Sequence, residues 1–178
     1  MSAIRRFQTV TVFMSRAGAV AAVVVLVLVA GLILLEIVLR TLFSMSTFIT
    51  GEFTGYGMAA MSFLALGESL DRGGLVRLSM IFSAFSPKGR QVLEVVVSIM
   101  TLGAVFVPLW YFGKSVLVDY THGYRSGTIS NIPIWIPEFA MWIGILIFWL
   151  RLLSYALLIA TGREQVDLEK STKIMGNN

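Results

Sequence analysis

Residues Ala17–Val38 read AGAVAAVVVLVLVAGLILLEIV, in which Glu36 is the only charged side chain. A bilayer hydrocarbon core of about 30 Å needs roughly 20 apolar residues in an α-helix, because a helix rises about 1.5 Å per residue. This run is long enough to cross the membrane, and it exceeds the apolar core of a signal peptide, which has about 7–15 residues. We therefore interpret it as a permanent membrane-spanning helix.

Three further apolar stretches follow the first one along the chain. Together they predict an all-α integral membrane protein with spans at about 17–38, 53–70, 92–113 and 134–160. We expect residues 1–162 to form a single four-helix membrane domain and residues 163–178 to form a polar tail. The fourth span is longer than a bilayer requires, so we expect it to tilt or to project into water.

The composition supports a membrane protein and excludes several kinds of site. Of the 178 residues, 57% are hydrophobic and 13% are charged, whereas a soluble domain is about 25% charged. The mean hydropathy is +0.83. The absence of cysteine and the presence of one histidine exclude thiolate zinc sites, iron–sulfur clusters and multi-histidine metal sites within the chain.

The basic residues predict the orientation of the spans. Ten of the 14 Lys and Arg residues lie in the N-terminal segment, in the connection between the second and third spans, or in the tail, and three lie in the other two connections. Positively charged segments stay on the cytoplasmic side. Both termini are therefore predicted to be cytoplasmic. The net charge of +4 belongs to these flanking segments, so we expect no nucleic-acid partner.

Two segments are predicted to lie on the membrane surface without crossing it. Residues 4–14 and 75–85 each place apolar side chains at helical spacing beside basic ones. Amphipathic basic helices of this kind dock among lipid headgroups. Membrane lipids are therefore expected partners, although an ordinary cytoplasmic loop at 75–85 is an alternative.

Charged residues near the ends of the spans form two layers of mixed sign. The outer layer contains Glu36, Arg40 and Glu138, and the inner layer contains Glu68, Arg72, Glu94 and Arg151. Glu36–Arg40 and Glu68–Arg72 have the i, i+4 spacing of a helical ion pair. We expect Arg151 to pair with Glu94 or Glu68, or to reach the headgroups. Ion pairs that fix helix positions are the leading interpretation; a proton or ion site and a subunit contact are the alternatives.

The second and fourth spans contain patterns typical of helix packing. Gly51, Gly55 and Ala59 recur at four-residue spacing, which allows close backbone approach in lipid, and predict that the second span is the most enclosed helix. Trp135, Trp142 and Trp149 recur every seven residues on one helical face. Trp135 suits the outer aromatic belt. The two deeper indoles either pack internally or against lipid, or form a ridge for a larger membrane partner.

Several sequence features, taken in order, resemble one family of membrane proteins. No catalytic motif or cofactor-binding motif is present, so neither an enzyme nor a cofactor is expected. The chain instead resembles the small membrane subunit of tripartite ATP-independent periplasmic (TRAP) transporters, the DctQ-like family, over residues 17–160. The matching features are Glu36, Arg40, Glu52, LGESL at 66–70, RGGLVR at 72–77 and IPIWIPE at 132–138.

This resemblance implies a non-catalytic role in the bacterial inner membrane. The small subunit would extend the scaffold of a large elevator-type membrane subunit. A periplasmic substrate-binding protein would deliver an organic acid, and a sodium gradient would drive uptake. One alternative is a stand-alone homodimeric transporter with Glu36 as proton carrier, although Arg40 one turn away favours the ionised carboxylate. A further alternative is a membrane anchor or assembly factor, or a membrane enzyme with an unrecognised site.

Overall fold

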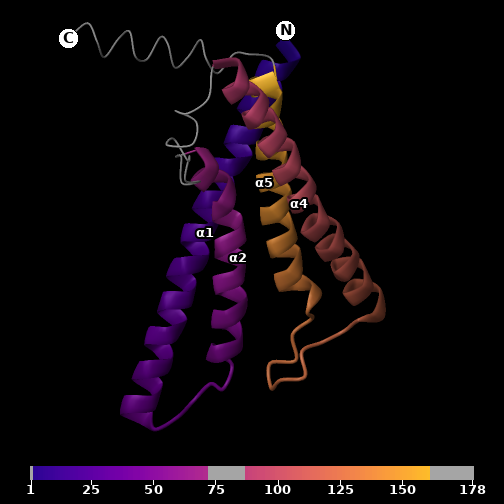
Figure 1. Ribbon diagram of the computed structural model, residues 1–178. Helices are drawn as coiled ribbons and strands as arrows, with labels where there is room; N and C mark the ends of the chain where they lie inside the picture. Colours follow the sequence, from indigo (N-terminus) through magenta and orange to yellow (C-terminus); the bar gives the residue numbers. More distant parts are fainter. Residues whose placement is uncertain (1, 72–86, 161–178) are drawn as a thin grey trace, which may run out of the picture.

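The computed structural model describes residues 2–71 and 87–160, and the regular structure in these ranges is helical (Figure 1). Within them, the only β-type pairing is an isolated bridge between Arg125 and Pro133. The all-α prediction is therefore confirmed for the described residues, and the predicted tail at 163–178 lies outside them. The helices are α1 (Ser2–Phe43), α2 (Thr50–Asp71), α4 (Pro87–His122) and α5 (Trp135–Ala160).

Three of these helices are long and apolar enough to cross a membrane. The candidate spans are Arg6–Phe43 in α1, Val95–His122 in α4 and Trp135–Leu158 in α5. Helix α2 is not among them, and it carries acidic residues near both of its ends. Its 22 residues nevertheless give a length of about 33 Å at about 1.5 Å per residue, which is close to the thickness of a hydrocarbon core.

Helix α1 corrects the prediction of a separate surface helix at residues 4–14. One continuous helix of 42 residues runs from Ser2 to Phe43, and residues 4–14 are its first turns. No proline or glycine precedes Gly18, so nothing in this segment stops the helix. Thr11 and Ser15 are fully buried, which fixes the segment to the other helices. The second predicted surface helix, at 75–85, lies outside the described residues.

The buried face of α1 consists mainly of small and polar residues, whereas its exposed face is aliphatic. Val20, Val27 and Leu28 are among the large apolar side chains that remain exposed. This pattern is the reverse of a water-soluble helix. It is expected in lipid, where helices gain most from close packing of small residues. The buried positions recur at intervals of three, four or seven residues and are Thr11, Ser15, Gly18, Ala22, Val29 and Glu36.

The packing face of α2 differs from the predicted one. A Cβ atom on Gly51 or Gly55 would meet nothing within 4 Å, so this face is open. A Cβ on Gly57 would lie 2.3 Å from a methyl group of Val29, and one on Gly67 would lie 2.9 Å from the Ser15 hydroxyl. Helix α2 therefore packs through a face formed by Gly57, Ala60, Leu64 and Gly67.

Helix α5, and not α2, is the most enclosed helix of the described chain. It contacts α1, α2 and α4. Ile145, Ile147, Phe148 and Leu152 supply four of the buried apolar side chains, whereas α2 supplies two. A Cβ on Gly144 would lie only 2.5 Å from the Phe63 carbonyl carbon of α2, so the two backbones approach closely at this point. The prediction that α2 is the most enclosed helix is therefore wrong.

The helices form two antiparallel hairpins, α1–α2 and α4–α5, which diverge toward their connections (Figure 1). The connections, residues 44–49 and 123–134, lie at the same end of the bundle, and the start of α1 and the end of α5 lie at the other end. Helix α2 contacts α5 and thereby joins the two hairpins, whereas α4 packs mainly against α5. The predicted outer-layer residues Glu36, Arg40 and Glu138 therefore lie near the two connections.

Candidate functional site

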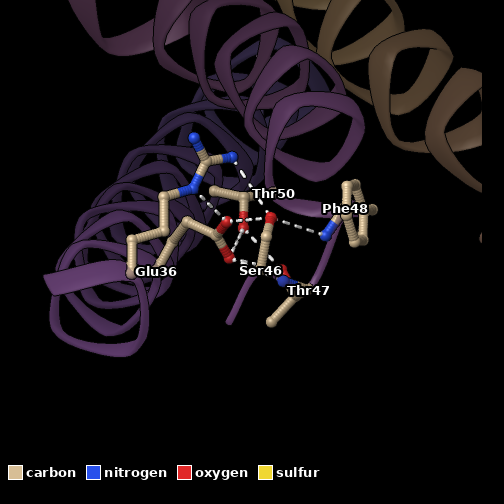
Figure 2. A network of polar contacts seen from close by, with 6 residues as sticks. Glu36, Ser46, Thr47, Phe48 and Thr50 are labelled. Carbon is tan, nitrogen blue, oxygen red and sulfur yellow. Dashed lines mark hydrogen bonds and ion pairs between the residues drawn. The ribbon is translucent and has the colours of Figure 1, made fainter. Parts of the chain in front are cut away.

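The end of α1 and the connection that follows it form a polar network around the buried carboxylate of Glu36 (Figure 2). One carboxylate oxygen accepts hydrogen bonds from the Arg40 Nε at 2.7 Å and the Ser46 hydroxyl at 2.6 Å. The other accepts from the Thr47 amide and hydroxyl, at 3.1 and 2.6 Å, and from the Thr50 hydroxyl at 3.1 Å. Glu36 therefore holds the end of α1, the connection and the start of α2 together.

The connection around this carboxylate has an unusual backbone. Ser44 and Phe48 have φ values of 51° and 59°, which are uncommon for residues with a side chain and cost about 1–3 kcal/mol each. The Phe48 amide donates to the Ser46 hydroxyl oxygen at 3.2 Å, and Arg40 Nη2 donates to the same oxygen. The network around Glu36 thus stabilises a conformation that would otherwise be unfavourable.

The sequence predicted the Glu36–Arg40 pair but not the hydroxyl donors. The i, i+4 spacing identifies an ion pair within one helix, and the structure forms it at 2.7 Å. The available signal was the group of four hydroxyl residues, Ser44, Ser46, Thr47 and Thr50, just after the helix that carries Glu36. Such residues donate readily to a nearby carboxylate in a tight connection.

A second network joins the start of α2 to the connection between α4 and α5. The hydroxyls of Thr128 and Ser130 donate to one oxygen of Glu52, and the Tyr56 hydroxyl donates to the other at 3.1 Å. Hydrogen bonds from the Ser126, Ser130 and Thr128 hydroxyls lower the pKa of Glu52 to about 2, against an opposing effect of burial. Glu52 is therefore ionised at neutral pH and connects the two hairpins where they diverge.

The tryptophans of α5 face α4. The Trp142 indole donates to the Leu109 carbonyl at 3.1 Å, and the Trp149 indole donates to the Leu102 carbonyl at 3.2 Å. The two indoles are seven residues apart on α5, and the two carbonyls that accept from them are seven residues apart on the antiparallel helix α4. The two hydrogen bonds are therefore equivalent contacts, two helical turns apart. Trp135 makes an edge-to-face contact with Tyr120, with ring centroids 5.5 Å apart. The two deep indoles thus lie within this chain's own packing.

The remaining candidate residues are distributed along the bundle. Glu138 lies half-buried on α5 beside Ser115 and Asp119 of α4, and one of its carboxylate oxygens has no hydrogen-bond partner among the described residues. Glu68 and Arg151 are half-buried and engaged by neighbours. Arg72 and the side chain of Glu94 lie outside the part of the chain that the structure describes. Within that part, no three His, Cys, Asp or Glu residues are placed to hold a metal ion.

Comparison with known proteins identifies one family. A family model described as "Tripartite ATP-independent periplasmic transporters, DctQ component" matches residues 29–162. The ectoine TRAP transporter small permease protein TeaB of Halomonas elongata is 29% identical over 130 residues, which is 73% of this chain. The chain spans 65% of the length of that relative. No solved structure matches the chain. The resemblance predicted from residues 17–160 is confirmed.

Proposed function

The chain belongs to the DctQ family of TRAP transporter components, and on this basis we propose that it is the non-catalytic small membrane subunit of a sodium-driven, binding-protein-dependent transporter for organic acids. The match over residues 29–162 is the observation that carries the proposal. Members of this family are transport proteins and not enzymes. Its partners would be a large membrane subunit of the same transporter and a periplasmic substrate-binding protein.

The proposed topology has four crossings of the bacterial inner membrane, with both termini in the cytoplasm. Three helices are candidate spans, and α2 has a length close to the thickness of the hydrocarbon core. The excess of basic residues in the flanking segments supports this orientation. In Figure 1, the start of α1 and the end of α5 lie at one end of the bundle and both short connections lie at the other, as an even number of crossings requires.

The proposed role is to brace the scaffold of the large subunit. The features that support it restrict motion: hydroxyl donors surround Glu36 and Glu52, and indole hydrogen bonds join α4 to α5. The Gly144 contact leaves the backbones of α2 and α5 little freedom to slide. These contacts suit a fixed brace better than a moving transport element.

The stand-alone transporter with Glu36 as proton carrier is the weaker alternative. Both carboxylate oxygens of Glu36 accept hydrogen bonds, and most of these come from the connection after α1 and hold its conformation. A carboxylate that releases and rebinds a proton in each cycle would have to break this network each time. Transport by the purified chain alone, abolished by Glu36→Gln, is the result that would favour this alternative.

The decisive experiment is reconstitution of uptake from separate components. The chain, a large TRAP permease from the same organism and the corresponding binding protein are combined in proteoliposomes. We expect solute uptake to require an inward sodium gradient and all three components, and a choline gradient serves as the control. The solute panel includes ectoine beside organic acids, because the Halomonas relative is named for ectoine. Full sodium-driven uptake without this chain would contradict the proposal.

The topology has its own test, which the absence of cysteine makes straightforward. Single cysteines replace Ser2 at the start of α1 and the exposed Ile129 in the α4–α5 connection. In intact spheroplasts, a membrane-impermeant maleimide should label Ile129→Cys but not Ser2→Cys, and lysis should expose both. Labelling of Ser2→Cys before lysis would overturn the proposed orientation.

A further inference from the structure

A shallow cavity of about 530 Å³, largely open to the surface, lies beside the connection between α1 and α2. Its lining combines one cationic side chain, two hydroxyls and two large apolar side chains: Arg40, Ser44, Ser46, Met45 and Phe48. Arg40, Ser46 and the Phe48 amide also belong to the Glu36 network, so the cavity lies directly against that network. The mixture of a cation with apolar walls is typical of a site for an amphiphile that carries negative charge.

The guanidinium of Arg40 is held in place at one edge of the cavity. Its Nε donates to Glu36 and its Nη2 donates to the Ser46 hydroxyl, so the plane of the group is fixed from one side. Its Nη1 has no hydrogen-bond partner among the described residues, and the side chain is 64% exposed, whereas that of Glu36 is 8% exposed. Because the hydroxyls of Ser46, Thr47 and Thr50 also bind Glu36, the carboxylate is satisfied from several sides. A guanidinium edge therefore remains available to an external anion.

The apolar side chains that line the cavity follow other exposed apolar residues at the end of α1. Met45 and Phe48 are 65% and 74% exposed, and Leu42 and Phe43, which precede them in the chain, are also largely exposed. Phe43 is the last residue of a candidate membrane span. That candidate span has 38 residues, which is more than the roughly 20 that a hydrocarbon core needs, and the apolar run predicted from the sequence ends at about residue 38. On this basis we place the cavity near the boundary between the hydrocarbon core and the headgroup region, where a cation and apolar side chains can both be accommodated.

We propose that this cavity binds the phosphate group of a membrane phospholipid, with Arg40 Nη1 and the Ser44 hydroxyl as donors and with Met45 and Phe48 against the upper part of the acyl chains. Arginine suits phosphate oxygens because its fork of N–H groups is rigid and always charged. An acidic segment of a partner protein offers the same charge, but it does not account for apolar walls that follow a candidate membrane span in the chain. The inference requires that α1 crosses the bilayer and does not depend on assembly with other subunits.

The test uses a substitution that changes the charge of the cavity without touching the Glu36 network. Met45→Glu places a carboxylate on the cavity wall, and Met45→Gln is its neutral control of nearly equal shape. The full chain in detergent micelles is titrated with dioleoyl phosphatidylglycerol, and bound lipid is counted by native mass spectrometry. We expect Met45→Glu to bind the lipid about tenfold more weakly than Met45→Gln, because a like charge near a protein surface costs about 1–2 kcal/mol. Equal binding by the two variants would overturn the proposal.

Two competitors identify the source of the phosphate. Dioleoylglycerol, which lacks the phosphate, should not displace the phospholipid at equal concentration, and displacement would mean that acyl chains alone determine binding. Inorganic phosphate at millimolar concentration should also leave the lipid bound, and displacement would identify a free-anion site in place of the lipid site. If the Met45 pair differs only in capture of the large permease, with lipid binding unchanged, the occupant is an acidic protein segment and the proposal is wrong.

Discussion

Gly144→Ala tests the closest approach between the two hairpins. A Cβ at this position would lie 2.5 Å from the Phe63 carbonyl carbon and 2.7 Å from the Leu64 nitrogen. Ordinary van der Waals contact begins at 3.4 Å, so α2 and α5 must separate by about 1 Å. The atoms that obstruct the methyl group belong to the backbone of a helix and not to a flexible side chain. The structure therefore predicts a real loss of packing at the centre of the bundle.

The size of this loss follows from two opposing effects. Overpacking of a well-packed site costs about 1–3 kcal/mol. The change from glycine to alanine in a helix favours folding by up to about 1 kcal/mol, whatever the surroundings. Gly55→Ala is the matched control, because it lies on the open face of α2 and a Cβ there meets nothing within 4 Å. The free energies of unfolding of the two alanine variants should therefore differ by about 1–3 kcal/mol, with Gly144→Ala the less stable.

Reversible unfolding by sodium dodecyl sulfate in mixed micelles, followed by tryptophan fluorescence, measures this difference. The same variants in the reconstituted transporter should show reduced uptake for Gly144→Ala and unchanged uptake for Gly55→Ala. Equal stability of the two variants would refute the close contact between α2 and α5. A larger loss of stability for Gly55→Ala than for Gly144→Ala would mean that α2 packs through the predicted face, which contains Gly51 and Gly55.

Three other substitutions test the polar and aromatic contacts. Glu52→Gln should remove a pH dependence of the free energy of unfolding. The pKa of Glu52 is about 2 in the folded chain and 4.5 in its reference state. The ionised carboxylate therefore stabilises the fold above pH 4.5, and this stabilisation declines as the pH falls toward 2. The wild type should therefore lose more stability than Glu52→Gln between pH 6 and 3 in unfolding titrations, and parallel curves would contradict this. Thr47→Val removes a hydroxyl donor to Glu36 and should lower the free energy of unfolding by about 1.5–3 kcal/mol. The control is Thr41→Val on the exposed surface of α1, which should change the free energy of unfolding by less than about 0.5 kcal/mol. Trp149→Phe removes the hydrogen bond to the Leu102 carbonyl and should cost about 0.5–1.5 kcal/mol in the same assay, with the exposed Trp110→Phe as a control near zero.

The sequence alone predicts the helices and one of the local contacts, because these depend on neighbouring residues. Continuous apolar runs must form helices in lipid, since no water is available to satisfy backbone groups. The Glu36–Arg40 pair is likewise local, because i, i+4 spacing places both side chains on one face of a helix. The family resemblance also depended only on the order and spacing of residues, and the family match confirms it.

The tertiary structure alone decided which face of each helix packs inward and which distant loops meet. In water, the apolar face identifies the core, but in lipid both the core and the surroundings accept apolar side chains. The spacing of Gly51 and Gly55 was therefore no guide to the side of α2 that meets its neighbours, and Gly57 and Gly67 supply the close contacts. The contact between Glu52 and Ser130 joins residues 78 positions apart. No local pattern specifies such a pair, because it forms only after α2 and α5 have packed and brought the two connections together.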